Sequence, residues 1–102
     1  MADVVDNPSQ HRFEMAVGDA LAVAHYETEG GRVVLLHTEV PPELAGQGIG
    51  SKLARGVFET LRGRGARVVT KCEFMAGYAT RHPEYAAMLY TDQPRGGRGS
   101  RG

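Results

Sequence analysis

The sequence predicts one mixed α/β domain (an α+β fold), in which an antiparallel meander precedes a crossover helix and a parallel strand. Three observations support this. Apolar residues alternate with a period of two through the first forty residues, then take helical spacing after a proline pair, then form a β-branched run directly after that helix. A length of 102 residues fits one compact domain.

Three strands make up the expected meander. Residues 13–17 alternate apolar and other side chains, and residues 21–26 do so again after a Gly-Asp turn. Gly30 and Gly31 supply the positive φ angles of a hairpin loop. The third strand covers Val33–Val40, and Pro41-Pro42 ends it because proline cannot donate to a ladder.

The helical elements follow the prolines. An amphipathic helix is predicted from near Gly48 to Arg62. Gly56 inside it costs about 1 kcal/mol relative to alanine, so we expect close packing on the sheet there. The run Ala66–Thr70 is a short strand, and a strand–helix–strand order implies a right-handed crossover that pairs it parallel with Val33–Val40. Two short helices are expected to follow, over Phe74–Thr80 and Pro83–Leu89.

The two ends differ in composition from the domain. Residues 1–11 lack periodicity, which predicts a flexible N-terminal arm, and residues 12–92 form the domain. Residues 93–102 read QPRGGRGSRG and predict a disordered Arg/Gly tail, because dense glycine is costly to order and no apolar side chain compensates. The preferred interpretation of this tail is a solvated end; contact with RNA is the alternative.

Charge and cysteine content exclude several classes of protein. Twelve basic residues balance twelve acidic ones, which argues against a nucleic-acid or anionic-membrane partner. A single cysteine excludes an internal disulfide framework and a multi-cysteine zinc site. Neither a signal peptide nor a membrane span is recognisable, so we expect a cytoplasmic protein.

The most informative segment is the glycine loop between the third strand and the long helix. Gly46, Gly48 and Gly50 allow the backbone to turn tightly and to present N–H groups to a ligand. The first N–H groups of a helix lack internal partners and lie at the positive end of its dipole, which suits a phosphate. The loop matches neither GxxxxGK[ST] nor GxGxxG, so spacing alone leaves an ordinary glycine turn equally open.

A family resemblance favours the ligand-binding interpretation. The run VPPELAGQGIGSKL resembles motif A of the GNAT acetyltransferases, [RQ]-x-x-G-x-[GA], with Gly48 and Gly50 at the glycine positions. Ala45 stands where that motif has Arg or Gln, which removes one side-chain phosphate contact. The longer run HTEVPPELAGQGIGSKL, the single cysteine and RHPEY resemble the short single-domain branch of GNAT-like N-acetyltransferases, over His37 to Tyr85.

The resemblance implies a minimal GNAT-like fold with a splayed parallel strand, and acetyl-CoA as the cofactor. Val40 at the end of the strand would contact the pantetheine arm. The glycine loop would hold the pyrophosphate, and Lys52 would add a charge unless it is an ordinary surface lysine. The loop residues expected to bind CoA are Gly46, Gln47, Gly48, Ile49, Gly50 and Ser51.

Cys72, which follows the strand after the long helix, is a candidate catalytic residue. A helix N-terminus and Lys71 favour its thiolate, whereas Glu73 opposes it. A buried, inert cysteine is the alternative. Two routes stay open: direct transfer, in which Glu39 or His37 on one strand face takes a proton from the amine, or acetylation of Cys72 first.

Three further expectations complete the set. The resemblance makes Tyr78 a general acid near the CoA sulfur, with aromatic packing as the alternative. His82 and Tyr85 of the RHPEY segment either close the pocket or pack at a helix start. The four histidines lack the i, i+4 spacing of a helical metal pair, so no metal is predicted.

Together these features predict an acetyl-CoA-dependent N-acetyltransferase that acts on an amine of a small molecule or peptide. The alternative is a CoA-binding or protein-interaction module without transferase turnover. The acceptor amine and the oligomeric state are not identified by the sequence.

Overall fold

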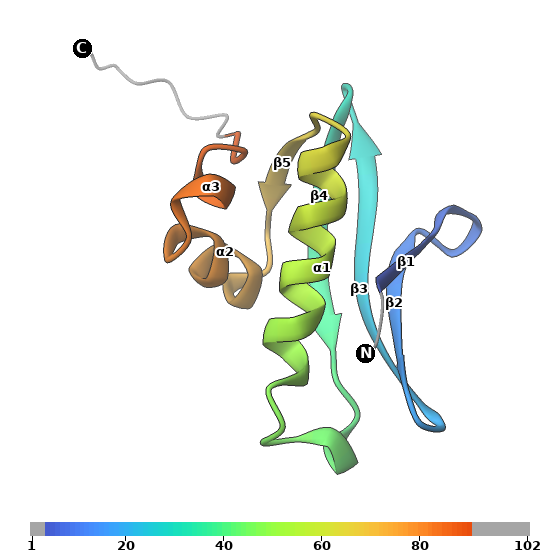
Figure 1. Cartoon of the computed structure of the whole chain (residues 1–102). Coiled ribbons are helices and arrows are strands. Elements are labelled where there is room, and N and C mark those ends of the chain that lie inside the picture. Colours follow the sequence, from blue (N-terminus) through green and yellow to red (C-terminus); the bar gives the residue numbers. More distant parts are fainter. Residues whose placement is uncertain (1–3, 91–102) are drawn as a thin grey trace.

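A five-stranded sheet is the central element of the computed structural model, which describes residues 4–90 (Figure 1). Its strands lie in chain order: β1 (Val4–Asn7), β2 (Arg12–Val17), β3 (Ala20–Glu29), β4 (Arg32–Glu39) and β5 (Arg67–Thr70). The first four pair antiparallel, and β5 pairs parallel with β4. The predicted fold class, a meander with one parallel strand, is confirmed.

The hairpin between β3 and β4 sets the register of the sheet. Gly30 and Gly31 both have positive φ angles, 59° and 79°, and Glu29 pairs with Arg32 across this two-residue turn. Such turns match the twist of the flanking strands, which explains why two glycines stand there. The pairing then runs without interruption to Tyr26 opposite Leu35.

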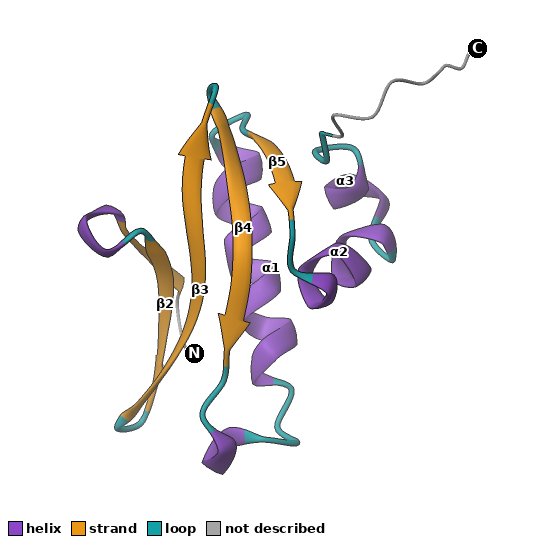
Figure 2. Ribbon diagram, turned by 180° about the vertical axis from the view of Figure 1, so that it is seen from behind, coloured by secondary structure: helices purple, strands orange, loops and turns teal. Residues whose placement is uncertain are grey.

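The long helix α1 (Ile49–Gly63) covers one face of the sheet (Figure 2). Its apolar residues recur at helical spacing, so one stripe is buried against the sheet. Gly65, with φ +67°, follows the helix end. The buried residues of the helix are Ile49, Leu53, Ala54, Val57, Phe58 and Leu61. The sheet contributes Phe13, Met15, Ala22, Ala24, Tyr26, Leu35 and Val68 to the same core.

The prediction of an irregular arm over residues 1–11 is wrong for the part that the structure describes. Val4–Asn7 form β1, which pairs with β2 from Val4 opposite Met15 to Asn7 opposite Arg12. The Tyr26 hydroxyl donates to Asp6 at 2.6 Å, and Arg64 pairs with the same carboxylate at 3.0 Å. These partners are distant in sequence, and a four-residue edge strand shows too little alternation to be recognised alone.

Close packing explains the glycine inside α1. A Cβ at Gly56 would lie 2.2 Å from Val4 Cγ2 and 2.7 Å from Val4 Cβ, far inside contact distance. The sequence-based expectation that Gly56 packs closely on the sheet is therefore confirmed, and β1 is the strand that it meets.

Two short helices follow β5 beside the sheet, α2 (Glu73–Thr80) and α3 (Pro83–Ala86) (Figure 1). The second helix is shorter than predicted. The chain after it turns back along β5: Val68 N–H donates to Met88 O at 3.1 Å, and Tyr90 N–H donates to Val68 O at 2.7 Å. Met88 and Leu89 still donate to Tyr85 O and Ala86 O as in a tight turn, while Leu89 forms a parallel bridge with Val68 of β5, so the helix ends where the chain joins the sheet.

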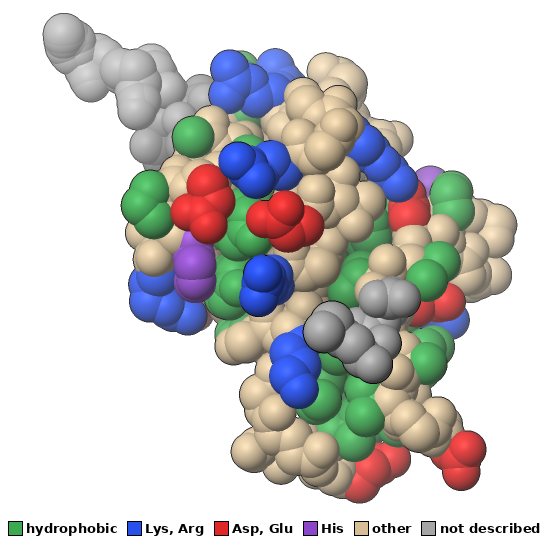
Figure 3. Space-filling view, in the orientation of Figure 1, with side chains coloured by type: hydrophobic (Ala, Val, Ile, Leu, Met, Phe, Trp, Pro, Cys, Tyr) green, Lys and Arg blue, Asp and Glu red, His purple; other side chains and the backbone are tan. Residues whose placement is uncertain are grey.

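The surface over α1 carries both signs of charge, with basic and acidic side chains interspersed (Figure 3). Among residues 4–90, no helix combines the length and the apolar composition that a membrane crossing requires. The predicted Arg/Gly tail, 93–102, lies outside the described residues.

Candidate functional site

A bulge in β4 opens the sheet. Tyr26 pairs with Leu35 and His25 pairs with His37, so Leu36 has no partner on β3. Pairing with β5 ends at the same level, at Leu35 opposite Thr70, with a last hydrogen bond from Lys71 N–H to Leu35 O of 2.8 Å. Because a bulge bends its strand, β4 and the chain after β5 separate beyond this point.

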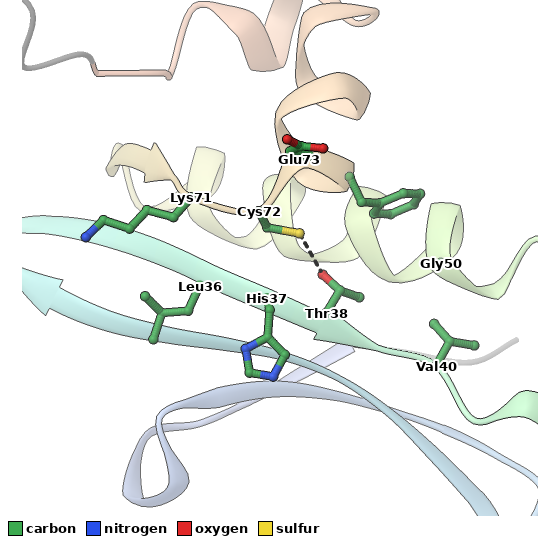
Figure 4. A pocket seen from close by; sticks show the side chains of 9 residues that line it. Leu36, His37, Thr38, Val40, Gly50, Lys71, Cys72 and Glu73 are labelled. Carbon is green, nitrogen blue, oxygen red and sulfur yellow. Dashed lines mark hydrogen bonds between the residues drawn. The ribbon is translucent and has the colours of Figure 1, made fainter.

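The separation leaves a cavity of about 470 Å³, within the usual range for small-molecule sites. Three segments line it: the second half of β4 with Val40, the start of α1 at Gly50, and the segment between β5 and α2 (Figure 4). The lining residues are Leu36, His37, Thr38, Val40, Gly50, Lys71, Cys72, Glu73 and Phe74. Four of the predicted site residues line this one cavity: His37, Val40, Gly50 and Cys72.

The Cys72 thiol points into this cavity and meets Thr38. Its sulfur lies 3.6 Å from Thr38 Oγ1 across the opening (Figure 4). The Thr70 side chain holds the cysteine backbone, accepting from Cys72 N–H at 3.1 Å and donating to Cys72 O at 2.8 Å. The half-buried thiol is therefore set by the end of β5 and the start of α2.

The side of the cavity that α1 forms is shaped by a glycine. A Cβ at Gly50 would lie 3.1 Å from the ring of Phe74, so the absent side chain leaves room for that ring. Phe74 itself is 41% exposed, which is unusual for a large apolar side chain and follows from its place on the cavity rim.

The N-terminus of α1 presents free backbone donors. Gly46 and Gly48 have φ angles of +82° and +72°, and a Cβ at either would meet nothing within 4 Å. Within residues 4–90, the N–H groups from Gln47 to Ser51 donate to no protein acceptor, and the first bond of the helix is from Lys52 N–H to Gly48 O. No acidic residue stands in the first turn of α1, so nothing there offsets the positive end of the helix dipole.

His37 and Glu39 form a hydrogen-bonded pair on β4. His37 Nε2 donates to Glu39 Oε2 at 3.0 Å, and this bond holds the pKa of the carboxyl below its usual value. The His37 side chain lies on the other side of β4 from Thr38 and Cys72 (Figure 4). His25 from β3 stacks on the His37 ring, with centroids 4.5 Å apart.

The remaining sequence candidates lie elsewhere. Tyr78 is buried, and its ring stacks against His82 and packs near Phe58, so the structure does not bring it to the cavity. His82 and Tyr85 also pack here: His82 Nδ1 bonds Tyr78 O at 2.7 Å, and the Tyr85 hydroxyl bonds Glu59 at 2.5 Å. Lys52 is exposed on α1 and does not line the cavity.

Sequence reasoning missed Thr38, Phe74 and His25. Thr38 stands between His37 and Glu39, so strand alternation alone indicates that it faces the opposite side of the sheet from them. His25 could not be found in this way, because its pairing with His37 depends on the bulge at Leu36.

Comparison with known proteins agrees with this geometry. A family model described as "GCN5-related N-acetyl-transferase" matches residues 12–88. An NMR structure of a GCN5-like protein from Staphylococcus aureus shares the fold, with a TM-score of 0.65 and 23% identity over 92% of this chain and 93% of that one. None of the curated proteins compared with the chain matches it. The chain belongs to the GCN5-related N-acetyltransferase family and is an acyltransferase.

Proposed function

We propose that the protein transfers an acetyl group from acetyl-CoA to an amine of a small molecule or peptide. The observation that carries this proposal is the opening between β4 and the chain after β5, which leads to the free N–H groups at the start of α1. One elongated ligand with a peptide-like arm and a phosphate end fits both features at once.

The β4 side of the opening suits the pantetheine arm. Within residues 4–90, no backbone hydrogen bond joins β4 beyond Leu35 to the chain that follows Lys71. Pantetheine carries amide groups, and an extended amide chain can bond to an open strand edge as another strand would. Val40 lines the same cavity, which supports the proposed contact with the pantetheine arm.

The start of α1 suits the pyrophosphate. The unpaired N–H groups from Gln47 to Ser51 and the helix dipole both favour an anion. Open space at Gly46 and Gly48 lets phosphate oxygens approach the backbone closely. Lys52 adds a positive charge one residue further along, and Ala45 at the usual Arg or Gln position leaves the backbone donors as the main contacts.

Acetyl-CoA would supply the acetyl group as a thioester, and transfer forms the C–N bond, breaks the C–S bond and leaves the nitrogen's proton on the CoA sulfur. Thr38 and Cys72 meet across the opening and would flank the reacting group. The Thr38 hydroxyl is the polar side-chain partner of Cys72 in residues 4–90, and a hydroxyl is too weak a base to activate a thiol. Direct transfer to the amine therefore fits better than an acetyl-cysteine. His37 and Glu39, which lie across β4 from Thr38 and Cys72, are kept as the proposed proton acceptors and would act through water.

Two measurements test this function. Calorimetric titration of the full chain with acetyl-CoA should show saturable binding, and absence of heat at millimolar ligand would exclude the proposal. A thiol-release assay over pools of small amines and peptides should then show release that depends on the acceptor. Saturable binding without such release would instead support the alternative of a binding module.

A further inference from the structure

The face of the sheet that α1 does not cover carries a cluster of three metal-ligand residues. His25 comes from β3 and His37 and Glu39 come from β4, and Figure 2 shows these strands in front of α1. On β3, the neighbours Ala24 and Tyr26 belong to the core on the α1 side, so His25 projects from the opposite face. We call these three residues the His-His-Glu cluster.

The donor atoms of the cluster are close together. Glu39 Oε2 lies 3.0 Å from His37 Nε2 and 3.5 Å from His25 Nε2, and all three atoms lie within 4.8 Å of one another. Zinc bonds of about 2.0–2.1 Å in a tetrahedron place neighbouring donor atoms about 3.3 Å apart. Two of the separations already lie close to that spacing.

His25 provides the second observation. Its side chain is 26% exposed, but its Nε2 atom is buried and has no hydrogen-bond partner in the described part of the chain. Glu39 Oε2, 3.5 Å away, is already bonded to His37 and lies at the limit of hydrogen-bond distance for His25. A buried ring nitrogen without a partner is costly, and a proton shared between His37 and Glu39 does not relieve that cost.

We propose that the His-His-Glu cluster binds a divalent transition metal ion of the zinc type. Two imidazole nitrogens and one carboxylate oxygen are a donor set that zinc accepts, with a fourth position left for water. The exposed side chains of His37 and Glu39 leave a path for the ion to enter. Imidazole nitrogens favour zinc over magnesium or calcium, which prefer oxygen ligands.

The charged groups around the cluster permit a cation. Arg12 on β2 stands opposite His25 on β3 in the sheet register. Its guanidinium Nε is bound to Glu14 at 2.7 Å. Glu39 supplies the negative charge of the cluster, and the hydrogen bond from His37 holds the pKa of its carboxyl below the usual value. Zinc would displace the proton that His37 Nε2 donates to Glu39 and bind the lone pair of that nitrogen, so His37 and Glu39 cannot bind the ion and take part in proton transfer at the same moment.

Zinc chloride titrated into the full chain at neutral pH tests the proposal by calorimetry. We expect one site per chain, no binding of magnesium, and at least tenfold weaker affinity in His25→Ala. His11→Asn is the matched control, because it removes an exposed imidazole at a position with φ 56° that asparagine tolerates. Cys72→Ser should also leave the zinc affinity unchanged, since the thiol points to the other side of β4.

NMR locates the ion independently of affinity. Zinc should shift the imidazole signals of His25 and His37 and leave those of His82 unchanged. If His25→Ala fails to fold by circular dichroism, His25→Gln takes its place. The absence of binding at 1 mM zinc, or equal affinity in wild type and the His25 variant, would overturn the proposal. Acetyl-CoA binding measured in EDTA is unaffected by either outcome, so the acetyltransfer function is tested separately.

Discussion

Thr38 and Cys72 are 34 positions apart in the chain, and their side chains meet across the gap between β4 and the end of β5, with Oγ1 3.6 Å from Sγ. The contact closes the inner end of the opening that the bulge at Leu36 begins. Thr38 comes from β4. Cys72 comes from the start of α2, where the Thr70 side chain holds its backbone by two hydrogen bonds. The thiol is thus positioned by the elements that create the cavity.

This contact leads to a prediction for Cys72→Ala. If transfer is direct, the variant should keep its turnover number within about tenfold of wild type, and initial-rate plots should intersect as for a ternary complex. Removal of a covalent nucleophile would cost about a thousandfold or more. A loss of that size, with parallel-line kinetics in the wild type, would show that the acetyl group passes through the cysteine.

The free N–H groups of α1 lead to a prediction for Ser51, which is exposed in the first helical turn. Ser51→Asp should weaken acetyl-CoA binding by about tenfold or more, because a carboxylate there repels the pyrophosphate. Ser51→Asn is the uncharged control of the same shape and should stay within about threefold. Calorimetry measures both. The helix dipole stabilises an aspartate at this position, so the variant should unfold at no lower temperature than wild type, and its weaker binding would not come from a folding defect. Equal affinity of the two variants would place the phosphates elsewhere.

The approach of Gly56 to Val4 leads to a prediction for stability. Alanine inside a helix is more favourable than glycine by about 1 kcal/mol. At position 56, however, its Cβ would lie 2.2 Å from Val4 Cγ2. Overpacking costs about 1–3 kcal/mol. Gly56→Ala should therefore lower the melting temperature by several degrees in thermal unfolding.

Gly63→Ala is the matched control for that change. It lies at the end of the same helix, and a Cβ there would meet nothing within 4 Å. This variant should be neutral or slightly stabilising. If Gly56→Ala is as stable as Gly63→Ala, β1 does not pack on α1 in solution.

The Tyr26–Asp6 hydrogen bond leads to a prediction with a defined pH range. Burial and this bond raise the pKa of Tyr26 to about 12 from an ordinary value of 10.0. The neutral phenol is therefore favoured in the folded state. Its contribution is complete below pH 10 and is lost as the pH rises toward 12.

Tyr26→Phe should accordingly lower the free energy of unfolding by about 1.5–3 kcal/mol at neutral pH, as expected for a bond to a charged group. The difference from wild type should shrink above pH 10. Tyr90→Phe is the control, since its ring stays beneath Arg32, 3.8 Å from the guanidinium carbon. Urea titrations at pH 7 and pH 10.5 give the comparison, and a difference that does not change with pH would mean that the phenol proton is not responsible.

Local patterns in the sequence were enough to predict most elements of the fold. Alternation gave the positions of β2, β3 and β4, the change to helical spacing after Pro41-Pro42 marked α1, and the run after it marked β5. These signals are local, because a strand or helix shows its buried face within a few residues. The edge strand Val4–Asn7 was missed because Met15, Tyr26 and Arg64 support it from far along the chain.

The candidate site divides in the same way. The glycine loop before α1 and Cys72 stand at recognisable junctions between elements, and Val40 could be named from the resemblance to the GNAT acetyltransferases. Their meeting around one cavity, and the place of Tyr78 in the aromatic core instead, depended on how α2 packs after β5.

What the sequence by itself determined is the order and type of the elements and the glycine loop that opens α1. What only the tertiary structure decided is the single extra residue at Leu36. A regular ladder from the Gly30-Gly31 turn would place Leu36 opposite His25. The bulge instead brings His37 there, beside Glu39, and coincides with the end of the β5 pairing. A bulge reflects the balance of packing on both faces of a strand, which involves residues from the whole chain, so no short pattern encodes it.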